Sequence, residues 1–140
     1  MIRVTVTDAV GSGALTAVRA RTIVRAVCAG EKVRIGELSF VILNDGRIRT
    51  INRKFLGHDY VTDVITFPLE EEGLTAEIFI NVRQAARQAK EYGVSLKNEL
   101  TRLVVHGTLH ALGYSDTTKA ERERMHRVQE RYVTALDTHR

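Results

Sequence analysis

Residues 100–116 read LTRLVVHGTLHALGYSD and constrain the fold more than any other part of the chain. Their apolar residues follow a helical period, and His106 and His110 are four positions apart. On a helix this spacing places the two imidazoles one turn above each other, with Cβ atoms about 5 to 6 Å apart, so both can bind one metal ion. An imidazole buried among so many apolar neighbours would lose its hydration without a compensating interaction unless it had a partner. This favours metal ligands over ordinary core histidines.

A third ligand follows the end of this helix. Gly113 suits the left-handed turn that ends many helices, so the chain reverses and Asp116 can approach the histidines. Three protein ligands with a fourth position open are typical of a catalytic zinc site, so we expect one zinc ion per chain on His106, His110 and Asp116. An alternative role for Asp116 is to cap the next helix.

The predicted site favours hydrolysis, because zinc lowers the pKa of a bound water from about 15.7 to about 7. In many zinc peptidases a glutamate follows the first histidine as general base, but this chain has Gly107, which disfavours peptidase chemistry. Glycine inside a helix costs about 1 kcal/mol relative to alanine. It therefore indicates close approach of a substrate or backbone, or tight helix packing. Beyond the metal-bound water, the sequence identifies no catalytic residue.

The length of 140 residues suits a single domain spanning residues 1–140. No apolar run approaches the roughly 20 residues of a membrane span, and the N-terminal residues lack signal-peptide features, so we expect a cytoplasmic protein without membrane contact. The only cysteine, Cys28, lies among apolar residues and is expected in the core, which fits a reducing compartment.

Periodicity predicts an α+β fold in which a four-stranded mixed sheet packs with about five helices, including a zincin-like metal-binding helix. The strands are expected at residues 2–7, 37–43, 64–69 and 76–80, the last two forming a hairpin joined by an acidic connection at residues 70–73. The helices are expected at residues 14–29, 45–56, 82–92, 96–112 and 118–136. Asn81, Ser95 and the Thr118/Glu121 pair are expected to cap the last three helices.

The chain carries 21 lysines and arginines against 17 acidic residues, a formal charge of +4. This excess favours polyanionic partners but is common among soluble proteins. Basic residues surround the predicted helix at 45–56, where they form either a solvated face or an RNA contact. Dense Arg and Glu alternation in the last helix indicates a solvated surface.

Two motifs together carry a family resemblance. The pattern H-G-x-L-H-x-x-G-Y-x-H is met by His106, Gly107, Leu109, His110, Gly113 and Tyr114, with Asp116 at the place of the third histidine. The pattern N-x-x-[YF]-R-x-x-D-x-P-T-D-V-L-S-F-P is met by Asn52, Phe55, Asp59, Thr62, Asp63, Val64, Phe67 and Pro68. The chain thus resembles the YbeY family of bacterial zinc-dependent endoribonucleases, which act in rRNA maturation and ribosome quality control.

The departures from these patterns affect the site. Aspartate at position 116 keeps a ligand type but adds negative charge, which should lessen the Lewis acidity of the ion and alter metal preference. Leu56 stands where the family has an arginine suited to phosphate. Arg53, Lys54 and His58 are therefore the RNA-binding candidates that the resemblance leaves.

The resemblance implies a single-strand-specific endoribonuclease whose partners are rRNA precursors and the small ribosomal subunit. Two alternatives stay open. Leu56 motivates a non-catalytic ribosome-assembly factor with a structural metal, and a metal-dependent hydrolase of a peptide or small ester is the other, which Gly107 disfavours.

Overall fold

A mixed four-stranded sheet supports the helix that carries His106 and His110. The computed structural model describes residues 1–69 and 74–138. The strands are β1 (Ile2–Asp8), β2 (Gly36–Leu43), β3 (Val64–Pro68) and β4 (Leu74–Asn81), in the order β1-β2-β4-β3. β1, β2 and β4 are parallel, whereas β3 pairs antiparallel with β4 and forms an edge. Pro68 ends this edge strand, where its missing N–H costs no ladder hydrogen bond.

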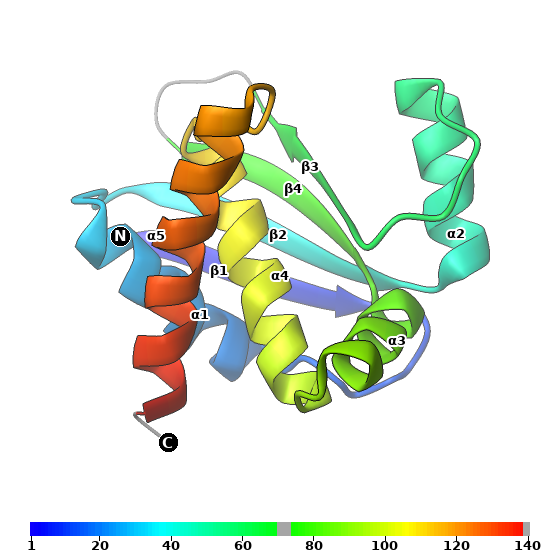
Figure 1. The fold of residues 1–140 in the computed structure, drawn as a ribbon, viewed down its shortest axis with the longest axis horizontal. Helices are drawn as coiled ribbons and strands as arrows, with labels where there is room; N and C mark the ends of the chain where they lie inside the picture. The colour runs from blue at the N-terminus through cyan, green and yellow to red at the C-terminus, as the bar shows by residue number, and fades with distance from the viewer. Residues whose placement is uncertain (70–73, 139–140) are drawn as a thin grey trace.

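Five α-helices lie around this sheet in the described part of the chain (Figure 1). They are α1 (Ala17–Gly30), α2 (Asp45–Ile51), α3 (Val82–Tyr92), α4 (Leu96–Ala111) and α5 (Lys119–Thr138), with a π-helical segment η1 (Asn52–Leu56) directly after α2. α4 is central, because it contacts α1, α3 and α5 as well as β3 and β4. The predicted α+β class, the mixed sheet and the β3–β4 pairing are confirmed.

The predicted helix caps are present. The side chain of Asn81 accepts the backbone N–H groups of Arg83 and Gln84, and Ser95 caps α4 in the same way. Thr118 and Glu121 form the reciprocal capping box at the start of α5, with bonds of 3.1 and 2.9 Å.

Two predicted helices differ from those in the structure, and the predicted connection at residues 70–73 cannot be compared with it. α1 begins at Ala17 rather than at residue 14, because the Thr16 hydroxyl caps it by accepting the Arg19 N–H. The helix predicted over residues 45–56 divides into α2 and the wider η1, which ends at Gly57 with a left-handed φ of 72°. The acidic connection predicted at residues 70–73 lies outside the described residues.

The main core lies between the sheet and helices α1, α4 and α5. Phe40 and Ile78 on the sheet and Val104 on α4 are fully buried there. Burying each such side chain contributes about 1.5 to 3 kcal/mol. Cys28 belongs to this core, as predicted, and its burial raises the thiol pKa to about 11, so the thiol is unreactive near neutral pH.

Gly107 lets α4 lie close against the sheet. A Cβ atom at this position would stand 2.8 Å from Ile78 Cγ2 and 3.3 Å from Thr66 Oγ1. Of the two explanations that the sequence left open for this glycine, tight packing is the one that the structure supports.

Glu31 joins three separate segments just after α1. Its two carboxylate oxygens accept the hydroxyls of Tyr114, in the loop after α4, and of Tyr132 on α5, both at 2.6 Å. Burial alone would raise the pKa of Glu31, but the two tyrosine hydroxyls, together with nearby Arg131 and Arg124, hold that pKa below its ordinary value.

Gly107→Ala should destabilise the fold. A new methyl group forced against buried Ile78 costs about 1 to 3 kcal/mol, which exceeds the gain of about 1 kcal/mol from helix propensity. Urea unfolding measures the difference. Gly46→Ala on α2 is the matched control, because its Cβ would meet only Asn44 Oδ1 at 3.9 Å and should stabilise slightly. Equal gains in both variants would contradict the packing argument.

Glu31→Gln should lower the free energy of unfolding by about 1 to 2 kcal/mol at pH 7, since hydrogen bonds to a charged acceptor weaken. The lowered pKa of Glu31 means that its ionised form stabilises the fold above the unfolded-state value near 4.3, and the contribution fades as the pH falls through both pKa values. Urea unfolding between pH 7 and pH 3.5 should show the gap closing. Exposed Glu91→Gln should change little at any pH.

Candidate metal centre

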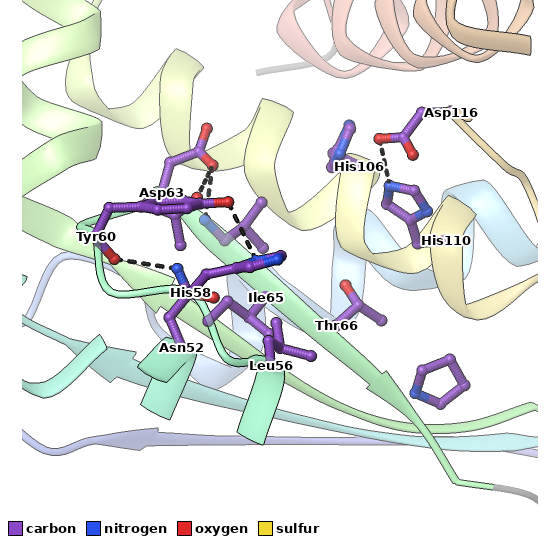
Figure 2. A pocket seen from close by; sticks show the side chains of 13 residues that line it. Asn52, Leu56, His58, Tyr60, Asp63, Ile65, Thr66, His106, His110 and Asp116 are labelled. Atoms are coloured by element: carbon purple, nitrogen blue, oxygen red, sulfur yellow. Dashed lines mark hydrogen bonds and ion pairs between the residues drawn. The ribbon is translucent and has the colours of Figure 1, made fainter. Parts of the chain in front are cut away.

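The three predicted metal ligands converge beside the C-terminal half of α4, which carries two of them. His106 and His110 project from the helix, and Gly113, with a φ of 104°, turns the chain so that Asp116 faces them (Figure 2). One ligand atom from each residue lies within 4.8 Å of the others. His110 Nε2 and Asp116 Oδ2 are 3.3 Å apart. Thr118 provides the cap of α5, so the alternative role for Asp116 as that cap is not supported.

Each imidazole has a hydrogen-bond partner at its Nδ1. His110 Nδ1 is 3.0 Å from the carbonyl oxygen of Tyr114, and His106 Nδ1 is 2.7 Å from Gln129 Oε1. A backbone carbonyl only accepts, so in neutral His110 the proton sits on Nδ1 and the Nε2 lone pair faces Asp116.

These three groups fit a metal ion. His110 Nε2 and Asp116 Oδ2 face each other at 3.3 Å, so either a proton or a metal ion between them would be held by both. A proton would satisfy only that pair, whereas a metal ion would also engage His106. Burial lowers the pKa of His106, which favours the neutral imidazole that binds metals. Two imidazoles and a carboxylate form a donor set typical of zinc.

A cavity of about 390 Å³ opens beside the ligands. Its walls come from η1, the loop after it and β3, and it is lined by Asn52, Leu56, His58, Tyr60, Thr62, Asp63, Val64, Ile65, Thr66 and Pro68 together with the three ligands. The described lining residues include no lysine or arginine. Asp116 lines this cavity and is half-exposed, so a molecule that enters the cavity from solvent can reach the predicted ligands.

The three RNA-binding candidates differ in position. His58 lines the cavity, and its ring stacks on Tyr60 with centroids 5.4 Å apart and planes 13° from parallel. Arg53 and Lys54 lie outside the lining residues. Arg53 Nη1 is 3.8 Å from Asp59 Oδ1, and the Lys54 ammonium lies 5.7 Å from the centroid of the Phe55 ring.

The structure adds site residues that the sequence did not assign. Asp63 places a second carboxylate on the cavity wall, and its Oδ1 accepts the backbone N–H of Val64 at 2.8 Å. Buried Asn52 holds the loop after η1 by donating to the Tyr60 carbonyl at 3.0 Å. Both residues belong to the second motif, so their place in that motif was the available signal. That motif lies far from His106 in the sequence, so the sequence alone did not indicate that Asn52 and Asp63 would lie near the ligands.

No helix within residues 1–69 and 74–138 is both long and apolar enough to cross a membrane.

The chain is similar in sequence to a known family of proteins. The family model described as Endoribonuclease YbeY matches residues 12–137. The Endoribonuclease YbeY of Desulfitobacterium hafniense is 36% identical over 136 residues, covering 89% of this chain and 87% of that protein. The Chloroherpeton thalassium protein of the same name is 38% identical over 120 residues, covering 85% of each chain.

A solved structure is also similar. The solution structure of TM1509 from Thermotoga maritima superposes with a TM-score of 0.69 at 28% identity, covering 95% of this chain and 87% of that one. The family model spans most of the sequence, and both curated relatives exceed 30% identity over more than two thirds of it. The chain therefore belongs to the YbeY endoribonuclease family.

Proposed function

We propose that this chain is a zinc-dependent endoribonuclease that cleaves single-stranded RNA during rRNA maturation and ribosome quality control. Family membership supports the endoribonuclease role in rRNA processing. The observation that carries the metal-dependent proposal is the convergence of His106, His110 and Asp116 at an open cavity. A bound zinc ion would supply Lewis acidity toward a phosphoryl oxygen and activate water at neutral pH.

The protein groups around the site have distinct proposed roles. His106, His110 and Asp116 hold the ion, one per chain. Asp63 reaches the same cavity with a carboxylate that can accept a proton or orient water. His58 and the half-exposed ring of Tyr60 form a stacked pair on its wall, a surface on which an unpaired base can stack. Stacking requires a base outside a duplex, so this wall favours single-stranded RNA.

The phosphate contacts are proposed outside the cavity. Arg53 and Lys54 are exposed on η1, next to Leu56, which does line the cavity. They would bind the phosphates of the RNA that lies outside the cavity. The proposed partners are rRNA precursors and the small ribosomal subunit in the cytoplasm, where the buried, free thiol of Cys28 is compatible with a reducing environment.

Asp116→Ala should lose metal and cleavage together. We expect about one zinc per chain in the wild type and at least a 100-fold weaker zinc affinity in the variant, because a direct ligand should matter at least as much as the outer partners that change affinity about 10- to 100-fold. Elemental mass spectrometry and cleavage of single-stranded rRNA fragments measure the two effects. Asp116→His restores the family pattern and should retain the ion.

The controls for this experiment separate the rival functions. Glu123→Ala removes an exposed acid on α5 and should change neither metal content nor cleavage. RNA binding without cleavage, combined with stability lost on chelation, would support an assembly factor with a structural metal. Cleavage of a peptide or ester, but not RNA, by zinc-loaded protein would support the other hydrolase. Normal RNA cleavage by metal-free protein would overturn the proposal.

Leu56→Arg should strengthen RNA binding. The side chain is 44% exposed on a cavity wall that lacks a described lysine or arginine, so an arginine there adds one phosphate contact. We expect about fivefold tighter binding of single-stranded RNA to metal-free protein, equivalent to about 1 kcal/mol. The slope of log affinity against log salt should steepen by about 0.7. Val18→Arg adds equal charge on exposed α1, and an equal gain there would contradict a local contact.

A further inference from the structure

We propose that Gln129 on α5 is a positioning residue for the metal centre: its side-chain amide fixes the tautomer and ring orientation of His106. The inference rests on the metal site of the proposed function and is independent of RNA cleavage. Gln129 is 23 positions from His106 in sequence, is 7% exposed, and its Oε1 lies 2.7 Å from His106 Nδ1.

The orientation of the Gln129 amide is set by its neighbour. Gln129 Nε2 is 3.1 Å from Glu130 Oε2, and a carboxylate only accepts hydrogen bonds. The amide nitrogen therefore faces Glu130, and the amide oxygen faces His106 Nδ1 at 2.7 Å. An oxygen acceptor at that distance requires a proton on Nδ1, which leaves the Nε2 lone pair for a metal ion.

Glu130 is itself held in place by α4. Arg102 donates Nε–H to Glu130 Oε2 at 2.8 Å and Nη2–H to Oε1 at 3.0 Å, a two-point contact. Because arginine stays charged and two-point contacts fix planar geometry, Glu130 remains a carboxylate with defined orientation.

A second, buried carboxylate fixes Arg102. Its Nη1 donates to Glu99 Oε1 at 2.8 Å, and Glu99 is 2% exposed. The other oxygen of Glu99 accepts the side-chain amide of Gln88 on α3 at 2.7 Å. A polar chain from α3 through α4 thus supports Glu130, and the contact with His106 itself is made by Gln129 on α5.

Gln129 gives a fixed acceptor without another charge. A carboxylate or carbonyl oxygen commonly accepts the second N–H of a metal-binding histidine, and loss of such a partner weakens metal binding about 10- to 100-fold. Here the predicted ligand set already contains the charge of Asp116, and the neutral amide orients His106 without increasing the negative charge around the ion.

The test compares Gln129→Met with Gln88→Met. Methionine has a similar length but accepts no strong hydrogen bond, and Gln88 is an amide in the same polar chain that does not touch His106. Zinc dissociation constants from chelator competition should rise about 10- to 100-fold for Gln129→Met and stay within about threefold for Gln88→Met.

A second readout needs no metal. Imidazole ¹⁵N shifts of metal-free wild-type protein should show His106 with its proton on Nδ1, and Gln129→Met should show a mixture of tautomers. A wild-type proton on Nε2, or unchanged zinc affinity in a folded Gln129→Met variant, would overturn the inference. Equal affinity losses in both methionine variants would also overturn it, since they would assign the effect to packing. A wild type that binds no zinc would instead reject the proposed function, and the ¹⁵N shifts would still decide the tautomer.

Discussion

The close contact between α4 and the sheet at Gly107 is the constraint on which the rest of the site depends. With no side chain at this position, the helix lies within van der Waals range of Ile78 on β4 and Thr66 on β3. His106 immediately precedes this contact and His110 follows it by three residues, so the depth of the helix also sets the depth of both imidazoles. The edge strand β3 then forms a wall beside the ligands rather than a distant layer.

Charge is distributed unevenly around this arrangement. The chain has a net charge of +4, but the described cavity lining contains two carboxylates, Asp63 and Asp116, and no lysine or arginine. A polyanion entering such a cavity meets unfavourable charge unless a cation lies between the acids and the phosphate. In the proposed enzyme a bound metal ion would provide positive charge at the reacting position, and the basic residues outside the cavity would act at longer range.

Local sequence patterns predicted much of the fold because they report local physics. Histidine spacing, cap residues and alternating strands identified α4, the capping box of α5 and all four strands. The change from α2 to the π-helical η1 at Asn52 was missed because the spacing of apolar residues over so short a segment does not distinguish the two helix types. The dense charges of α5 predicted a solvated surface, yet Gln129 is buried and Glu130 pairs with Arg102. Such pairing between helices depends on tertiary packing, which charge spacing alone does not specify.

The Glu31 junction has a further consequence for the site. Tyr114 uses its hydroxyl to reach Glu31 and its carbonyl to accept from His110, so a single residue connects the end of α1 to one of the proposed metal ligands. His106 is held from α5 through Gln129, and α5 also reaches Glu31 through Tyr132. A metal ion bound to these histidines would therefore favour the arrangement in which α1, α5 and the loop after α4 are docked together. A ligand at a hundred times its dissociation constant stabilises the folded state as a whole by about 2.7 kcal/mol, so a bound metal ion would keep the junction of α1 and α5 docked under conditions that unfold the metal-free chain.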